Sequence, residues 1–258
     1  MIFYFTGTGN SLYAAKQLGK ELISIPQAIH DREKIYRADE IGIICPVYGH
    51  EMPPMLREFL KEAEFETPYL FLVLTYGNIH GGAPELARQE LECSGKRADY
   101  INTLKMVDNF LPGFDMDEQM AAEPEKRIEE HLAQICEDVK AHRKWIQPVT
   151  EEDRAWHRKF LERQKPSPSG TGQTFYRVTD DCIGCGICKR ICPAGCIELQ
   201  GQRAVHIPGN CQMCMACIHH CPENAIQLTI PEKNPKARYH NEHIRLTEII
   251  RANEQHEN

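Results

Sequence analysis

Two runs of cysteines decide the fold of the C-terminal part of this 258-residue chain. The first is Cys182-Ile-Gly-Cys-Gly-Ile-Cys-Lys-Arg-Ile-Cys-Pro193, and the second is Cys211-Gln-Met-Cys-Met-Ala-Cys-Ile-His-His-Cys-Pro222. Both read C-x2-C-x2-C-x3-C-P, so the pair is an internal repeat. Thiolates this close in sequence can converge on one centre only if the chain wraps tightly, and Gly184 permits such a turn because it lacks a Cβ. The proline that closes each run fixes φ and redirects the chain.

This spacing resembles that of bacterial two-cluster ferredoxins, in which the fourth cysteine of each run binds the other cluster. The resemblance implies two 4Fe-4S clusters and a crossed set of ligands. Its first set is Cys182, Cys185, Cys188 and Cys221. Its second set is Cys211, Cys214, Cys217 and Cys192.

Zinc and disulfides are the alternatives for these cysteines. A structural zinc ion takes four ligands, often from two C-x2-C pairs, and two four-cysteine runs closed by proline fit that pattern poorly. Disulfides belong to oxidising compartments and small secreted domains. Both alternatives therefore explain the repeat less well than clusters do.

Composition places the chain among soluble globular proteins with room for two domains. It is 41% hydrophobic and 26% charged, which is ordinary for such proteins. The formal net charge of -7 disfavours nucleic acid as the main partner. Residues Met1–Phe5 lack the basic segment of a signal peptide, and no apolar stretch is long enough to span a membrane. With 12 cysteines, the chain suits a reducing compartment, so we expect a cytoplasmic protein.

A strand, a glycine-rich loop and a helix open the chain. Ile2–Phe5 is wholly apolar, as in a buried parallel strand, and Leu12–Leu22 has apolar residues at helical spacing. The loop between them is Thr6-Gly-Thr-Gly-Asn-Ser11, and this layout is typical of a phosphate site at a helix N-terminus. The loop lacks the third glycine of a dinucleotide fingerprint, because Leu12 stands there, and it lacks the G-K-[ST] of a P-loop. A plain strand-to-helix turn is the alternative.

The loop resembles the FMN phosphate loop of flavodoxins, T-x-T-G-N-[ST]. Further apolar strands at Ile41–Cys45 and Pro68–Leu74 are each followed by a helix, from near Pro53 or Pro54 and from Pro84 to about Leu91. Tyr100–Val107 alternates and reads as an edge or half-covered strand. Alternating strands and helices predict an α/β, doubly wound parallel sheet of the flavodoxin-like kind.

In such sheets a ligand binds beyond the carboxyl ends of the strands. The flavodoxin resemblance therefore implies that two more loops flank the flavin ring, with Tyr48 and Tyr76 as candidates for stacking on it. Each tyrosine could instead cap the sheet, and His50 and His80 are either proton donors or structural residues. The implied FMN-binding residues are Thr6, Gly7, Thr8, Gly9, Asn10, Ser11, Pro46, Val47, Tyr48, Gly49, Thr75, Tyr76, Gly77, Asn78, Gly81 and Gly82.

The rest of the chain joins these two parts. We predict a helix within residues 117–146, with Pro124 in its first turn and an apolar stripe reaching Ile146. A second helix, rich in Lys and Arg, begins at Thr150, where Asp153 three positions on resembles a capping box. A solvated face is the simplest interpretation of this helix, and docking against an acidic partner or the cluster domain is the alternative. The predicted domains are 1–165, flavodoxin-like; 166–173, a linker; 174–230, a small α+β ferredoxin domain; and 231–258, a tail with a helix capped by Thr247. We expect His219 and His220 at the surface.

The whole chain resembles the EFR-type flavodoxin–ferredoxin fusion family of anaerobic bacteria and archaea. The resemblance implies electron transfer between two 4Fe-4S clusters and FMN, with a ferredoxin-like donor and an unknown acceptor. The alternatives are a carrier without a substrate of its own, or a docking module that has lost FMN. No acid, base or nucleophile set is evident, so no catalytic residue is named and enzymatic activity stays open. We expect redox proteins such as ferredoxin as partners, and a homodimer stays open.

Overall fold

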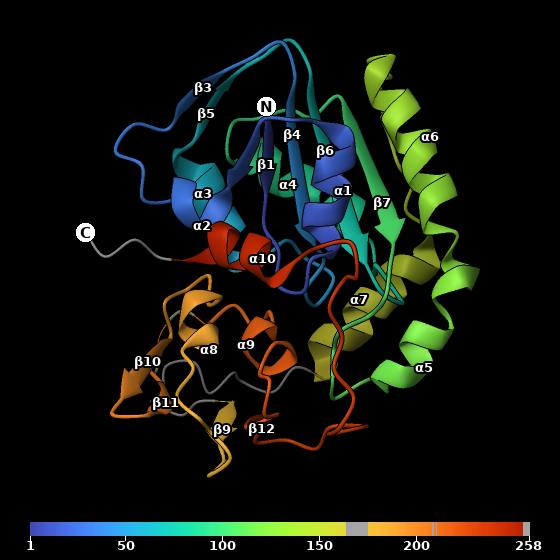
Figure 1. Ribbon diagram of the computed structural model, residues 1–258. Coiled ribbons are helices and arrows are strands. Elements are labelled where there is room, and N and C mark those ends of the chain that lie inside the picture. Colours follow the sequence, from blue (N-terminus) through green and yellow to red (C-terminus); the bar gives the residue numbers. More distant parts are fainter. Residues whose placement is uncertain (164–174, 208, 210, 255–258) are drawn as a thin grey trace. The chain divides into compact units, whose positions relative to one another are not determined.

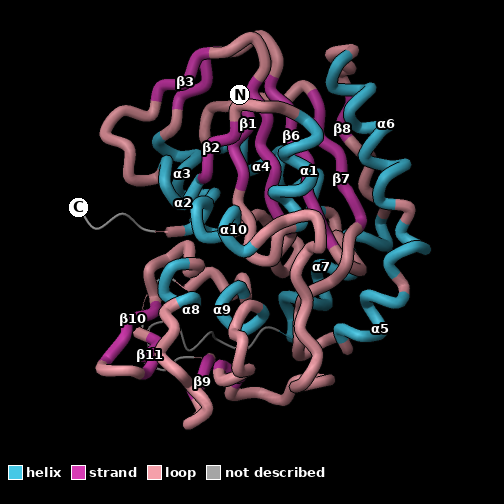
Figure 2. Tube along the Cα trace, in the orientation of Figure 1, coloured by secondary structure: helices cyan, strands magenta, loops and turns pink. Residues whose placement is uncertain are grey.

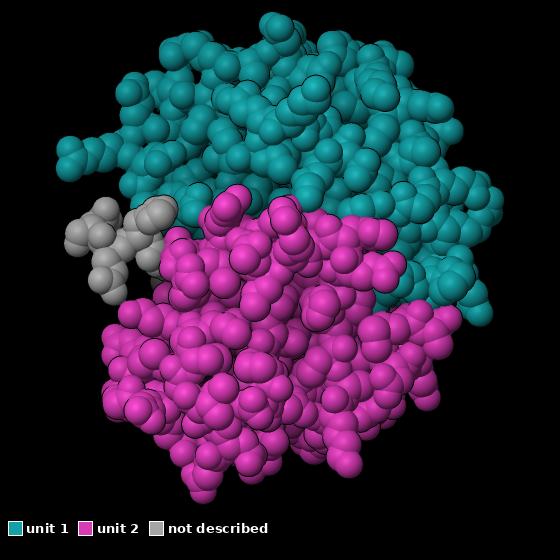
Figure 3. Space-filling model, viewed as in Figure 1, with its two compact units in different colours: residues 1–5, 10–107, 123–164 teal, residues 6–9, 108–122, 165–258 magenta. Residues whose placement is uncertain are grey.

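The computed structural model describes residues 1–163, 175–207, 209 and 211–254. Its contacts divide the chain into two compact units, which Figure 3 colours separately. Unit 1 contains residues 1–5, 10–107 and 123–164, and unit 2 contains residues 6–9, 108–122 and 165–258. Residues 6–9, from the glycine-rich loop, thus group with the C-terminal part of the chain. The predicted linker, 166–173, lies outside the described residues.

Unit 1 is built on a six-stranded parallel sheet with the order β2-β1-β4-β6-β7-β8 (Figure 1). The strands β1, β4 and β6 at its centre are apolar and almost completely buried, as expected for a parallel sheet covered on both faces. This order is compatible with the predicted flavodoxin-like sheet and confirms the α/β class. The strands are β1 (Ile2–Tyr4), β2 (Leu22–Ser24), β4 (Ile41–Pro46), β6 (Leu70–Tyr76), β7 (Tyr100–Lys105) and β8 (Trp145–Ile146).

Helices cover both faces of this sheet (Figures 1 and 2). Helices α1 and α6 contact each other on one face, while α3 and α4 lie on the other. No helix in the described ranges is long and apolar enough to cross a membrane. The helices of unit 1 are α1 (Asn10–Leu18), α2 (Ile25–Ala28), α3 (Pro54–Glu62), α4 (Ala83–Cys93), the 3-10 helix η1 (Glu123–Lys126), α6 (Ile128–Lys140) and α7 (Glu151–Arg163). A separate parallel pair joins β3 (Ile35–Arg37) to β5 (Glu64–Glu66).

The sheet has its topological switch point between β1 and β4. From β1 the chain crosses to β2 on one side, and the next strand of the sheet, β4, pairs with β1 on the other side. The carboxyl ends of β4 and β6 are neighbours, since Pro46 lies opposite Thr75. Within unit 1 the loops after these strands therefore begin side by side, where ligands of doubly wound sheets bind.

Two predicted helices of unit 1 are wrong in their bounds. Helix α1 stops at Leu18, and Leu22 belongs to β2, because the chain must turn at Gly19 to return to the sheet. Residues 117–146 do contain a helix of several turns, α6, but Pro124 lies before it in η1 and Ile146 lies after it in β8. A helical stripe cannot reveal these breaks, because they depend on pairing with the sheet. Strand β7 is half-covered rather than an edge strand, since β8 pairs with it and only part of its residues are buried.

Unit 2 holds the cysteine runs on short helices and two small antiparallel sheets. Strand β12 pairs with β9, and β10 forms a hairpin with β11. Each run leads through one helical turn to a strand, so the internal repeat of the sequence is also a structural repeat. The elements of unit 2 are α5 (Met116–Ala121), β9 (Tyr176–Val178), α8 (Ile187–Arg190), β10 (Ile197–Gln200), β11 (Arg203–His206), α9 (Ala216–His219), β12 (Ile226–Leu228) and α10 (Leu246–Asn253).

The cap of helix α10 lies two residues earlier than predicted. Its cap position is Arg245, whose backbone N–H donates to Glu248 Oε2 at 3.0 Å. The predicted cap, Thr247, already lies inside the helix. By contrast, the cap predicted for α7 is confirmed, because Asp153 N–H donates to Thr150 Oγ1 and Thr150 N–H donates to Asp153 Oδ2.

Candidate cysteine centres and glycine-rich loops

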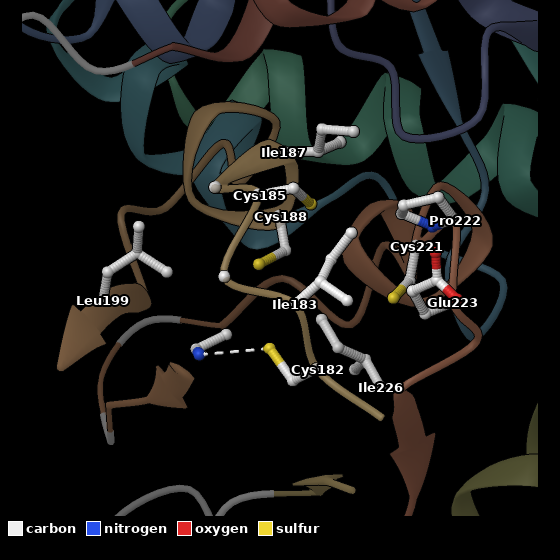
Figure 4. Close-up of a pocket in the computed structure, with 13 residues that line it drawn as sticks. Cys182, Ile183, Cys185, Ile187, Cys188, Leu199, Cys221, Pro222, Glu223 and Ile226 are labelled. Carbon is white, nitrogen blue, oxygen red and sulfur yellow. Dashed lines mark hydrogen bonds between the residues drawn. The ribbon is translucent and has the colours of Figure 1, made fainter. Parts of the chain in front are cut away.

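The first predicted set of thiols surrounds one cavity in unit 2 (Figure 4). Cys182, Cys185 and Cys188 come from the first run, and Cys221 comes from the end of the second. The rest of the lining is mostly apolar, with Ile183 and Ile226 among it. Thiols from both runs thus meet at one cavity, as crossed ligation requires.

The electrostatic interactions at two of the thiols agree with crossed ligation. After burial, the pKa of Cys188 is raised by Cys185, Cys221 and Cys182. The pKa of Cys217 is raised, again after burial, more by Cys214, Cys192 and Cys211 than by Cys188 of the first set. For these two thiols the strongest interactions are therefore with the partners that crossed ligation assigns to them.

Burial favours the protonated form of Cys188, Cys211, Cys214 and Cys217 when no iron is bound. It raises the pKa of Cys188 to about 11 and the pKa of Cys214 and Cys217 further. The pKa of Cys192 is instead lowered to about 7, chiefly because its sulfur accepts a hydrogen bond from Cys196. Iron binds the thiolate, so cluster assembly at this site must release protons.

Backbone N–H groups already point at several of the sulfurs. Ala204 N–H donates to Cys182 Sγ at 3.4 Å, and Ala225 N–H donates to Cys221 Sγ at 3.2 Å. Cys196 N–H donates to Cys192 Sγ, also at 3.2 Å. Such bonds stabilise negative charge on sulfur and help to set the potential of a cluster.

The donor chemistry at this cavity fits a cluster. Its lining contains four cysteine sulfurs and otherwise mostly apolar residues. A 4Fe-4S cluster is held by four cysteine thiolates. The residues present therefore fit such a cluster.

The two sets differ in their exposure to solvent. In the first set Cys185 is exposed, Cys182 and Cys221 are half-buried, and the side chain of neighbouring Ile183 is 60% exposed. In the second set Cys192, Cys214 and Cys217 are buried and only Cys211 is half-buried. The symmetric sequence repeat therefore has unequal surroundings.

His219 lies in the core of unit 2, so its predicted surface position is wrong. The ring is 3% exposed, its Nε2 lies 2.8 Å from the Asn109 carbonyl, and its Nδ1 accepts a hydrogen bond from Tyr239 N–H. Burial lowers its pKa to about 3, so the ring is neutral. Sequence patterns offered no signal for this residue, because Asn109 is 110 residues away.

The glycine-rich loop contributes to both units. In unit 2, Gly9 has φ of 105° and its N–H donates to Thr6 Oγ1, while Asn109 donates to Thr8 Oγ1 at 2.9 Å. In unit 1, Asn10 donates to the Val107 carbonyl. The hydroxyls of Thr6 and Thr8 are thus buried, and each accepts a hydrogen bond from another polar group of unit 2.

Ser11, the last residue of the loop, is fixed within unit 1. Its hydroxyl lies 2.8 Å from Thr75 Oγ1, and both side chains are almost fully buried. Thr75 ends the run of buried residues in β6, where the second predicted flavin loop begins. The structure thus brings together two predicted loop residues that are 64 positions apart.

Residues 46–50 and 75–82 form the two loops predicted to flank the flavin ring, and helix α7 packs on them at Gly49. A Cβ on Gly49 would lie 2.7 Å from the Phe160 ring, and a Cβ on Gly81 would lie 2.2 Å from the His50 ring. Both glycines have positive φ, at 59° and 53°. This chain's own aromatic rings therefore fill the space beside these glycines.

The two candidate stacking tyrosines are half-buried. Tyr48 is bridged to Glu51 through the backbone, and Tyr76 meets His80 edge-on at 5.3 Å. Burial lowers the pKa of His80 despite the nearby Asp153 of α7. The lysine- and arginine-rich sequence of α7 did not reveal that the helix packs on these loops.

The comparisons with known proteins concern the cysteine region. Residues 181–225 match the model of the 4Fe-4S dicluster domain. Pyruvate synthase subunit PorD of Methanocaldococcus jannaschii is 34% identical over 68 residues, which are 25% of this chain and 79% of that protein. These findings confirm a ferredoxin-like domain and iron–sulfur clusters.

Two other relatives match over a smaller share of their own length. NADH-quinone oxidoreductase subunit I of Pelobacter propionicus is 31% identical over 61 residues, which are 19% of this chain and 33% of that protein. One subunit of the ion-translocating oxidoreductase complex of Methanosarcina acetivorans is 43% identical over 47 residues, which are 18% of each chain. All three relatives are named as enzyme subunits, and two of them as subunits of oxidoreductases. Through residues 181–225, the chain belongs to the family of 4Fe-4S dicluster domain proteins.

Proposed function

We propose that this protein transfers electrons through two 4Fe-4S clusters to or from an FMN held by its N-terminal sheet. The observation that carries the proposal is the meeting of Cys182, Cys185 and Cys188 of the first run with Cys221 of the second run at one cavity. The dicluster match and the redox relatives support the iron–sulfur part. The place of the glycine-rich loop, between β1 and the start of helix α1 beside the switch point of the sheet, supports the flavin part.

In this proposal the cysteine runs hold the clusters and the fold controls their surroundings. Each cluster carries one electron at a time, and FMN accepts one or two. The N–H groups of Ala204, Ala225 and Cys196 stabilise sulfur charge, and the buried second set excludes water from its cluster. The chain therefore presents one accessible and one protected thiol set.

The residues that would hold FMN are the predicted ones, with one restriction from the structure. Thr6–Ser11 would bind the phosphate through hydroxyl and backbone N–H groups. The ring would lie against Tyr48 or Tyr76, away from the faces of Gly49 and Gly81 that Phe160 and His50 occupy. Redox proteins such as ferredoxin are the proposed partners, and a homodimer is compatible with the proposal. A carrier without its own substrate is the alternative function.

The experiment that tests this proposal is a cofactor count on protein purified without oxygen. Iron, sulfide and FMN are measured per chain together with the visible spectrum, and about eight irons and one FMN are expected. Cys185→Ser should lower the iron content to about half, while Cys93→Ser is the matched control because Cys93 is an exposed cysteine outside both runs. Ser11→Ala should lower the FMN affinity, with Ser94→Ala as its control.

The outcomes separate the two parts of the proposal. A chain that takes up no iron, even after anaerobic reconstitution, would contradict the cluster part. A full complement of iron with no FMN bound, even after FMN is added, would contradict the flavin part and favour the carrier. Equal iron loss in Cys185→Ser and Cys93→Ser would contradict the ligand assignment.

A further inference from the structure

The glycine-rich loop lies against a ligand of the second cluster. Within unit 2, a Cβ on Gly7 would stand 2.6 Å from the carbonyl oxygen of Cys214 and 3.2 Å from its Cβ. Real Cβ atoms do not approach backbone so closely, so only glycine fits here. Gly7 does not have positive φ, which means that close approach, rather than backbone conformation, requires glycine at this position.

One buried side-chain amide of unit 2 holds the loop at this place. Asn253, at the end of α10, donates to the carbonyls of both Thr6 and Ile191, at 3.0 and 3.2 Å. Ile191 precedes Cys192, another ligand of the second set. A single buried side chain therefore ties the loop to a second ligand-bearing segment.

The opposite end of the loop is fixed as well. Thr8 accepts hydrogen bonds at two atoms, from Asn109 at its hydroxyl and from Asn241 N–H at its carbonyl. A Cβ on Gly9 would meet the Asn241 side chain at 2.9 Å. Thr6 and Thr8 are 1% and 3% exposed. The loop is thus enclosed on both sides by unit 2.

We propose that residues 6–9 form a wall of the second cluster's site and protect that cluster from solvent and reagents. The first cluster has no such cover at Cys185 and Ile183, which are exposed. Two clusters with the same ligand motif therefore differ in accessibility, because a loop that is distant in sequence covers only one of them. The inference rests on the cluster part of the proposed function and does not require FMN.

The experiment follows iron release from the anaerobic holoprotein in excess bathophenanthroline disulfonate, a chelator of ferrous iron. In the natural chain we expect about four irons to leave quickly and about four to leave at least about tenfold more slowly. Cys185→Ser assigns the phases, because a chain without the first cluster should show the slow phase alone. Electron paramagnetic resonance of the reduced protein checks which cluster remains.

Two variants test the wall itself. Gly7→Ala should speed the slow phase about tenfold, which corresponds to about 1.4 kcal/mol less protection, and leave the fast phase unchanged. Asn253→Leu should have the same effect without adding an atom next to Cys214. Gly209→Ala is the matched control: its Cβ would meet only Cys196 Sγ, at an ordinary 3.7 Å, and its φ is not positive.

The results distinguish this inference from the proposed function. A natural chain without iron contradicts the proposed function. If the natural chain holds both clusters but loses its iron in one phase, the proposed protection by residues 6–9 is contradicted. It is also contradicted if neither Gly7→Ala nor Asn253→Leu changes the slow phase. If Gly7→Ala takes up only the first cluster while Gly209→Ala takes up both, the wall is supported. If Gly7→Ala takes up neither cluster, the rate of slow iron release from Asn253→Leu decides: a faster slow phase supports the proposal, and an unchanged one contradicts it.

Discussion

Crossed ligation predicts which pairs of cysteines belong to one cluster. Replacing Cys192 and Cys214 together should remove only the second cluster, although the two residues come from different runs. Replacing Cys188 and Cys192 together should remove both clusters, although these residues share a run and are only four positions apart. The pairing rests on the cavity that Cys182, Cys185 and Cys188 line together with Cys221 of the other run.

The expected magnitudes follow from the number of clusters left. The Cys192→Ser/Cys214→Ser chain should keep about four irons, and the Cys188→Ser/Cys192→Ser chain should keep almost none. Ligation within each run predicts the opposite result for both chains. Iron and sulfide are counted after anaerobic reconstitution, and Cys93→Ser/Cys136→Ser is the control with two cysteines replaced outside the runs.

The reasoning is refuted if the Cys188→Ser/Cys192→Ser chain keeps a complete cluster. Circular dichroism of each reconstituted chain shows whether unit 1 has kept its fold, so that iron loss through general unfolding is recognised. Because the two chains carry the same number of changes, only the pairing of the ligands distinguishes them.

Three further predictions concern unit 1. Tyr100→Phe should lower the free energy of unfolding by about 1–3 kcal/mol, because the buried tyrosine hydroxyl donates to the buried Asp138 carboxylate at 3.0 Å. Tyr36→Phe, which removes an exposed bond to Asp31, should lower it by less than about 1 kcal/mol. A double-mutant cycle of Ser11→Ala and Thr75→Val should give a coupling energy of about 1 kcal/mol in chemical denaturation; additive effects would contradict their hydrogen bond. Burial lowers the pKa of His50 to about 4, so the unfolded chain takes up a proton near pH 6.5 before the folded chain does. The free energy of unfolding should therefore fall by about 1–2 kcal/mol between about pH 7 and pH 5, after allowance for partial exposure, and His50→Gln should show a smaller fall.

Local sequence patterns predicted the features that depend on residues close together in the chain. The spacing of the cysteines indicated two clusters, and apolar runs beginning at Ile41 and Pro68 indicated buried parallel strands. The cap of α7 was also predictable, because Thr150 and Asp153 are three residues apart. Such patterns succeed because one helical turn or one strand is decided by its own residues.

Tertiary packing decided the features that join distant segments. Pairing with β7 made a strand of Ile146, and Asn109 and Tyr239 buried His219. Packing on Gly49 placed Phe160 of α7 over a loop that the sequence had assigned to flavin alone. In each case the partner lies too far along the chain to leave a periodic signal.

The glycine-rich loop shows the difference most clearly. Its sequence, Thr6-Gly-Thr-Gly-Asn-Ser11, determines a tight connection between a strand and a helix, with hydroxyls suited to phosphate. That Gly7 lies against the backbone of Cys214 depends on contacts across more than two hundred residues of sequence. Local conformation is encoded by neighbouring residues, whereas close approach depends on which surfaces pack together, so only the folded chain determines it.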